Sequence, residues 1–434
     1  MDWLFDVPAY VKVGSSFLGI LLLYRLKAPL GAAILVFSIL LTLWTGAGAS
    51  GLRFLISSFV LPQNYLLPLI ILLLLFFSDA LNKTGRMGRT IAALKTWLRS
   101  KHLMLAGLPA LVGLLPMPAG ALFSAPFVDA VDQGQEIEPQ RKVAINYWFR
   151  HIWEYWWPLY PGVILAMQYS GLSAVMFFLI QVPFTFAAVL GGYLFILKKI
   201  KRSGDDQKNG GYLDAAAVFA ALGPIGLLVM ISLVGSILLP LIGVEGTLAN
   251  LTAMVVGLAA ALTAVFKGHM PAFVITLRML TRMDTWLMIV LVLGIQTFAA
   301  ALSCPVDATG ATLIAGMRDE LIQTGIPLIM VIMLIPFISG MVTGVAFGFV
   351  GASFPIVFAL VEPDPSVAVA AATTAFAYTF GYMGMMLSPM HACFVVTAEY
   401  FKSSIFDAYR YIIGPVLVIL LASILLSTVY YSVL

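Results

Sequence analysis

Long apolar stretches separated by short polar segments make up most of this chain. Uncharged runs at residues 66–77 and 415–429 extend into windows of about 20 residues, the length that an α-helix needs to cross a bilayer. These apolar positions are continuous rather than alternating, so they predict helices and not the strands of a transmembrane barrel. The pattern therefore predicts an all-α polytopic membrane protein with about eleven transmembrane helices.

Two apolar stretches, at residues 103–135 and 325–361, contain residues that break helices. The first is rich in prolines, which lack a backbone donor, and the second is interrupted by glycines. Non-helical backbone at membrane depth is tolerated only where it is buried in protein or lines a cavity. We therefore expect two re-entrant hairpins with their tips at a binding site, although kinked helices packed through small residues would give the same pattern. The tip residues expected at the site are Pro118, Ala119, Gly120, Ser124, Thr343, Gly344 and Ser353.

Two further spans, at residues 143–170 and 366–401, are interrupted near their middle. Prolines break the first, and a Ser-Pro pair followed by a histidine breaks the second. The histidine is either structural or part of the site. We expect both breaks to face the same cavity as the hairpin tips. The candidate substrate- and ion-binding residues at the breaks are Pro161, Ser388, Pro389 and His391.

Several patterns recur in the same order half a chain apart. Ser78 with Thr84-Gly85 recurs as Ser303 with Thr309-Gly310, and the Ser-x-Pro pattern at Ser124 recurs at Ser353. Matches in one order at nearly the same separation indicate an internal duplication, and duplicated halves with interrupted apolar segments are typical of secondary transporters. We expect a first repeat at residues 1–198, a cytoplasmic linker at 199–213 and a second repeat at 214–434.

Basic residues predict how the chain is oriented in the membrane. Of the 24 Lys and Arg residues, only Lys12, Arg53 and Arg318 fall in segments predicted to lie outside, and Arg150 falls within a span. Cytoplasmic loops carry an excess of Lys and Arg, so both termini are expected outside. The two hairpins then enter from opposite sides, which makes the two repeats inverted.

Composition supports a membrane location and narrows the chemistry. The 434 residues are 61% hydrophobic and 10% charged, whereas soluble domains are about a quarter charged. The basic residues lie beside the membrane, so the net charge of +4 does not indicate nucleic acid. Cys304 and Cys393 show no metal-ligand spacing, and the sequence has no motif of an ATPase, metalloprotease or serine hydrolase. We expect no enzyme, no metal and no cofactor, apart from H+ or Na+ as coupling ion.

Three ionisable residues, Arg150, His151 and Glu154, fall inside the first broken span. Such groups are costly in a membrane and normally face an aqueous cavity. On one interpretation Arg150 binds a carboxylate, while His151 and Glu154 carry protons. On another, the charges neutralise each other on one helix face. On a third they lie near the interface, where tryptophans at 148, 153, 156 and 157 would form an aromatic belt.

Residues 116–126 (PMPAGALFSAP) and 150–162 (RHIWEYWWPLYPG) resemble an uncharacterised branch, domain of unknown function 401, of the ion transporter superfamily of secondary carriers. The resemblance covers essentially the whole chain. It implies an elevator-type transporter fold, a homodimer in the cytoplasmic (inner) membrane of a bacterium or archaeon, and substrate and ion sites at the hairpin tips and helix breaks. The Ser-Asn-Thr tip motifs of the sodium/dicarboxylate members are missing, which argues against sodium coordination by the same geometry. The Arg150–Glu154 charge cluster makes protons an alternative driving ion.

The leading hypothesis is a secondary active transporter of a small organic anion, a carboxylate by preference, coupled to H+ or Na+. Its partners would be that anion, membrane lipids and a second copy of the chain. An alternative is a cation/proton antiporter without an organic substrate, in which Glu154 exchanges ions. A third hypothesis is a lipid-handling or receptor-like protein that transports nothing soluble, and the number of polar breaks in the spans argues against it.

Overall fold

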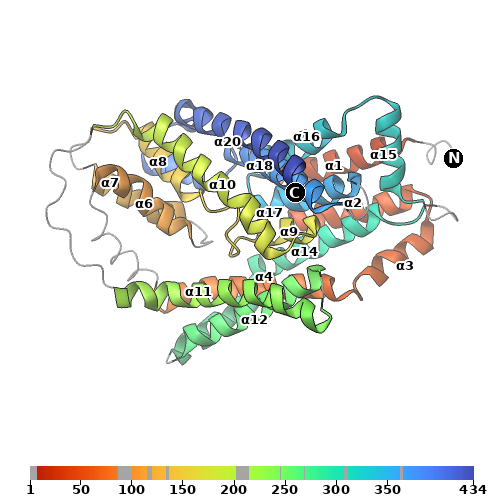
Figure 1. The fold of residues 1–434 in the computed structure, drawn as a ribbon, viewed down its shortest axis with the longest axis horizontal. Coiled ribbons are helices and arrows are strands. Elements are labelled where there is room, and N and C mark those ends of the chain that lie inside the picture. Colours follow the sequence, from red (N-terminus) through yellow and green to blue (C-terminus); the bar gives the residue numbers. More distant parts are fainter. Residues whose placement is uncertain are drawn as a thin grey trace.

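The computed structural model shows an all-helical protein (Figure 1), as the apolar pattern predicts. Among the described residues, extended backbone pairs only at an isolated bridge between Pro305 and Thr312. The structure describes residues 7–86, 100–114, 120–132, 136–201, 215–244, 246–267, 269–306, 311–361 and 365–434. The predicted tip residues Pro118 and Ala119 lie outside the described residues, as do most of the amphipathic stretch expected near 86–101 and most of the linker at 199–213.

Six helices in the described part of the chain are long and apolar enough to cross a membrane. They are α4 (Pro62–Lys83), α10 (Ala174–Gly192), α11 (Ala215–Leu238), α12 (Gly246–Phe266), α14 (Met283–Leu302) and α20 (Ile405–Val433). The number rises to seven if α15 (Leu313–Gln323) and α16 (Leu328–Thr343), between which the chain bends by 119°, are counted as one span. The expected number of about eleven also counts broken and shorter apolar helices, and it stays a prediction.

Shorter helices complete this part of the fold. They are α1 (Ala9–Arg25), α2 (Leu30–Trp44), α3 (Gly48–Ser58) and α13 (Met270–Leu277), with helical turns at Tyr193–Leu197, Leu239–Ile242 and Arg278–Thr281. Helix α4 packs against α12 and α14, and α11 packs along α12. Figure 1 shows α4, α11 and α12 together below the rest of the molecule.

Two helix pairs occupy the regions predicted to form hairpins. The first pair is α6 (Lys101–Gly113) with α7 (Gly120–Val131), and the second is α16 with α17 (Ala346–Leu360). The turn of the second pair contains Gly344, whose φ of +63° is a left-handed conformation that glycine adopts without a steric penalty. Gly344 therefore forms the turn, as the sequence pattern indicates, whereas Gly340, Gly348 and Gly351 lie within the helices.

The two broken spans are α8 (Pro139–Arg150) with α9 (Pro161–Ser170), and α18 (Val367–Met386) with α19 (Ala392–Tyr400). The second break lies at the predicted Ser-Pro pair. The first differs from expectation, because α8 ends at Arg150, well before the prolines. The interpretation that Arg150, His151 and Glu154 share one continuous helix face is therefore wrong.

Hydroxyl groups from neighbouring helices explain the early end of α8. They donate to backbone carbonyls of the break, so these carbonyls are hydrogen-bonded without the backbone N–H groups of a continuing helix. The pairs are Tyr382 to His151 (2.7 Å), Thr185 to Ile152 (2.6 Å) and Tyr378 to Glu154 (2.6 Å). The second break is satisfied in the same way, by Tyr147 on the Met386 carbonyl (3.1 Å) and Tyr409 on that of Leu387 (2.8 Å).

The hairpins and breaks pack crosswise between the two halves of the chain. Helix α7 of the first hairpin packs against α19, and α17 of the second packs against α9. Asn146 joins three of these elements, because its amide donates to the Ala121 carbonyl in α7 and to the Thr397 hydroxyl in α19, both at 3.0 Å. This crossing brings the helix ends together around a cavity.

Candidate functional site: a charged cavity between the helix breaks

A cavity of about 310 Å³ lies where both helix breaks meet the second hairpin turn. Its opposite wall comes from α4 and α14, which contribute apolar side chains such as Leu74 and Met288. The polar residues of the lining are Ser78, Arg150, His151, Glu154, Tyr160, His391 and Cys393. A larger hollow of about 570 Å³ between α16, α18 and α20 is lined mainly by apolar side chains and no charged ones. The charged cavity is therefore the candidate site.

Three helices begin at this cavity. Their first residues line it, and their N-cap residues provide no side-chain hydrogen bond to the exposed amides. The pairs of first residues are Pro161 and Gly162 of α9, Ala346 and Phe347 of α17, and Ala392 and Cys393 of α19. Helix N-termini carry unsatisfied N–H groups and a partial positive charge, so this convergence favours an anion.

Arg150 lies at the centre of the contacts between hairpin and breaks. Its side chain is buried, at 3% exposure, and Nη1 donates to Sγ of Cys393 at 3.2 Å. On the other side, a Cβ at Gly120 would overlap the guanidinium. Since Gly120 begins α7 and Cys393 lies in the first turn of α19, the guanidinium bridges the first hairpin and the second break.

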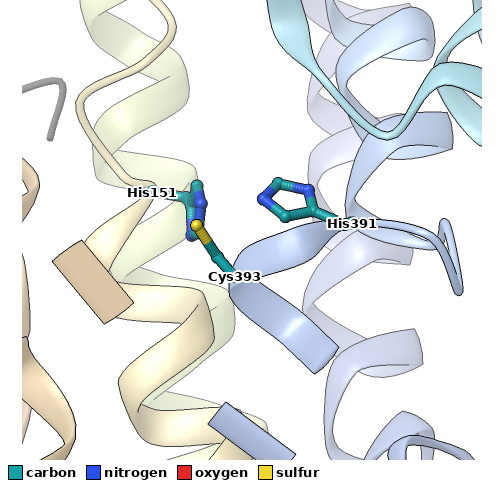
Figure 2. A group of neighbouring side chains, drawn as sticks. All are labelled: His151, His391 and Cys393. Atoms are coloured by element: carbon teal, nitrogen blue, oxygen red, sulfur yellow. The ribbon is translucent and has the colours of Figure 1, made fainter. Parts of the chain in front are cut away.

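His151 and His391 face each other in the lining of the cavity (Figure 2), with perpendicular rings whose centroids are 4.9 Å apart. Nδ1 of His151 lies 2.6 Å from the Tyr147 carbonyl, and Nε2 lies 3.8 Å from a Glu154 carboxylate oxygen. The hydroxyl of Tyr160 lies near the Glu154 carboxylate and donates to the Gly113 carbonyl. The ionisable residues of the first break thus form one connected group with a histidine from the second.

The four tryptophans near the first break bond within the protein. Each indole N–H donates a hydrogen bond of 2.8–2.9 Å. The acceptors are the Ala188 carbonyl for Trp148, the Ala110 carbonyl for Trp153, the Thr185 hydroxyl for Trp156 and the Leu114 carbonyl for Trp157. A belt at the membrane interface would present these donors to water and headgroups. The contacts instead favour a structural role, in which Trp153 and Trp157 fasten the end of α6 to the break.

Of the remaining predicted site residues, some line the cavity and the others do not. Pro161 and Gly344 line the cavity together with Arg150, His151, Glu154 and His391. The hydroxyls of Ser124, Thr343 and Ser353 are buried and donate to carbonyls of the preceding turn in their own helices. Ser388 donates to the Met341 carbonyl at 2.7 Å and so ties the second break to the second hairpin, while Pro389 is exposed.

Sequence reasoning missed Cys393 and Tyr160. No local pattern connects Cys393 with the first break, because Arg150, which it contacts there, is 243 positions away. Tyr160 precedes Pro161, a proline of the first break, and this position in the sequence could have identified it as a site residue. Both cysteines are free thiols.

These features define a polytopic α-helical membrane protein whose broken helices enclose a charged cavity. The chain belongs to the family described as "Protein of unknown function (DUF401)", whose model matches residues 15–434. Its structure is similar to the crystal structure of the Alcanivorax borkumensis YdaH transporter, with a TM-score of 0.56 and 14% sequence identity over 88% of each chain. At that identity the likeness concerns the fold. No curated protein matches the chain.

Proposed function

We propose that this protein is a secondary active transporter of a small organic anion, with carboxylates as the first class to test. The observation that carries this proposal is the convergence of three uncapped helix N-termini and the buried Arg150 on one cavity. A guanidinium matches a carboxylate with two parallel donors, and the helix ends add further N–H groups. The cavity volume of about 310 Å³ suits a small ligand, and the fold resembles that of a transporter.

Protons are the coupling ion that the geometry favours over Na+. Glu154 and His151, which exchange protons readily in suitable surroundings, both line the cavity. Transporters bind Na+ through carbonyls of unwound helices. Here the break carbonyls of His151, Ile152 and Glu154 already accept hydrogen bonds from side-chain hydroxyls.

For the membrane arrangement we propose two inverted repeats, 1–198 and 214–434, within the ion transporter superfamily. In an elevator motion, hairpins and breaks would slide past α4 and α14, whose apolar side chains form the opposite wall of the cavity. The protein would work as a homodimer in the inner membrane with both termini outside, which requires an odd number of complete crossings in each repeat and an even total. Labelling of cysteines introduced at Lys201 and Arg318 tests this arrangement, since the two must react from opposite sides of the membrane.

Uptake into proteoliposomes tests the function. The full-length protein is reconstituted and offered radiolabelled succinate, citrate, gluconate or lactate under an imposed pH or Na+ gradient. The proposal requires saturable accumulation of at least one of these anions, dependent on the gradient and absent from protein-free vesicles. A trapped pH-sensitive dye reports the competing function: proton exchange for Na+ or K+, with no anion accumulated, would identify a cation/proton antiporter instead.

A further inference from the structure

His151, His391 and Cys393 come together in the cavity wall, although the first is far from the other two along the chain. One donor atom from each residue lies within 4.8 Å of the other two. Figure 2 shows His151 and Cys393 side by side with His391 facing them. Donor atoms bound to one Zn2+ ion lie about 3.3–3.8 Å apart, so these side chains would close on an ion by shifts of roughly 1 Å.

The two imidazole rings are held as they are in metal sites. Nδ1 of His151 lies 2.6 Å from the Tyr147 carbonyl oxygen, so it carries the proton and leaves a lone pair on Nε2. The His391 ring lies beside the Met385 backbone, while its Nδ1 is buried without a hydrogen-bond partner among the described residues. Metal-binding histidines commonly donate their second N–H to a carbonyl. A buried polar nitrogen without a partner calls for a ligand.

Cys393 adds a soft ligand whose charge is balanced. Arg150 donates to its sulfur at 3.2 Å, and Cys393 lies in the first turn of α19, so both neighbours stabilise a thiolate. With the Arg150 guanidinium included, a divalent ion, one thiolate and two neutral imidazoles leave two positive charges. A carboxylate oxygen of Glu154, 3.8 Å from Nε2 of His151, is near enough to offset one of them. Sulfur and imidazole donors select late transition metals over Mg2+, Ca2+ or Na+.

We propose that His151, His391 and Cys393 form a site for a late first-row transition-metal ion, with Zn2+ as the reference ion. Three protein ligands leave a fourth coordination position, which here opens into the cavity. The site goes beyond anion transport and does not depend on it, because metal binding is measured on the purified protein without a transport assay.

Cobalt substitution tests the site on the full-length protein, purified in detergent and stripped of metal with a chelator. Co2+ bound to a thiolate produces a charge-transfer absorption, and we expect one such ion per chain, displaced by Zn2+. Cys393→Ser should abolish this absorption, and His391→Gln should weaken Co2+ binding at least about tenfold. The matched controls are Cys304→Ser and His102→Gln, which change the other cysteine and a histidine outside the cluster and should bind as the wild type does.

Two results would overturn the site: folded wild-type protein that shows no thiolate absorption with Co2+, or absorption that persists in Cys393→Ser. If the variants do not fold, alkylation of the wild type decides the matter. Zn2+ should slow alkylation of Cys393 at least about tenfold, while the same concentration of Mg2+ should leave it unchanged. Equal alkylation rates with and without Zn2+ would refute the proposal.

Discussion

Gly120 at the start of α7 and Arg150 at the end of α8 are in direct contact: a Cβ on Gly120 would overlap the guanidinium. The glycine thus sets how closely the first hairpin approaches the proposed anion-binding arginine. Other residues at position 120 would push the guanidinium away from its place beside Cys393.

The substitution Gly120→Ala should therefore weaken carboxylate binding about tenfold, or about 1.4 kcal/mol, with modest overpacking of the hairpin. Isothermal titration with the carboxylate that is best transported measures this change. Gly226→Ala in α11 is the matched control, because a Cβ there meets open space. Equal binding by the wild type and Gly120→Ala would show that the position of the guanidinium is not critical.

Replacement of Arg150 tests its role in recognition. Arg150→Ala should reduce carboxylate affinity roughly ten- to a hundredfold, since charge-assisted hydrogen bonds in a dry site contribute about 1.5–3 kcal/mol. Arg150→Lys should recover only part of the loss, because lysine offers a point charge without the two-pronged donor. Uptake and binding with the same carboxylate measure both variants, and Arg282→Ala, in an exposed pair with Asp284, is the control.

The competing interpretation is that Arg150 and Glu154 merely neutralise each other. In that case the double replacement Arg150→Leu with Glu154→Leu would restore expression, stability and transport that each single replacement lowers. Full transport by the double variant would eliminate the proposed anion-binding role.

The apolar runs and helix-breaking residues were enough to predict the all-helical fold, the two helix pairs and the second break. Local composition decides these features: Gly344 takes a left-handed turn that other residues disfavour, and continuous apolar runs form helices in lipid. The end of α8 could not be predicted in this way. Its position depends on hydroxyls of Tyr378, Tyr382 and Thr185, which come from other helices.

The candidate site was predicted only in part, because some of its residues are brought together by contacts between distant helices. Intramembrane charge singled out Arg150, His151 and Glu154, because burial of such groups is costly wherever they lie along the chain. The grouping of Cys393 and His391 with them is a property of the tertiary fold, and no local pattern contains it. Serines at the repeated Ser-x-Pro motifs were expected at the site, yet the Ser124 and Ser353 hydroxyls bond within their own helices.

Removal of the tyrosine hydroxyls should destabilise the first break. Tyr378→Phe leaves the Glu154 carbonyl without its 2.6 Å donor in a buried position, which should lower the free energy of unfolding by about 1–3 kcal/mol. Thermal unfolding in detergent should show a lower Tm for this variant. Tyr431→Phe, at an exposed position, is the control, and an unchanged Tm for Tyr378→Phe would mean that another group satisfies the carbonyl.

Asp132, in the loop after α7, should make stability depend on acid. It accepts hydrogen bonds from the Ile137 and Glu136 amides and pairs with Lys142 at 3.0 Å. Burial alone would raise the pKa of its carboxyl, but the hydrogen bonds, chiefly with Lys142, outweigh burial and hold the pKa below 3.8. Its contribution to stability is therefore complete above the ordinary pKa and is lost as pH falls through the lowered one.

Asp132→Asn should lower stability near neutral pH by about 1–3 kcal/mol and flatten the acid side of the Tm profile below pH 4. Thermal unfolding between neutral pH and pH 3 measures both effects. Glu136→Gln, which changes an exposed carboxylate paired with Lys101, should retain the wild-type profile. If the Tm of Asp132→Asn falls in acid as steeply as that of the wild type, other carboxylates cause the acid sensitivity.

Glu154 is the residue through which protons would drive transport. Its carboxylate lines the cavity, lies 3.8 Å from Nε2 of His151 and has the Tyr160 hydroxyl nearby. Glu154→Gln keeps the shape of the side chain and resembles the protonated acid, but it cannot release or take up a proton. We therefore expect loss of uptake driven by a pH gradient, while exchange of internal for external substrate continues.

Both activities are measured in the same proteoliposomes, with Glu399→Gln, an exposed glutamate on α19, as the control. Uptake driven by the pH gradient must be compared with substrate exchange, because damage to folding or to the anion site would reduce both activities together. Only a defect in coupling removes one and leaves the other. Full uptake under a pH gradient in Glu154→Gln would exclude Glu154 as the proton carrier. His151→Gln, tested in the same two assays, would then show whether the neighbouring imidazole carries the proton instead.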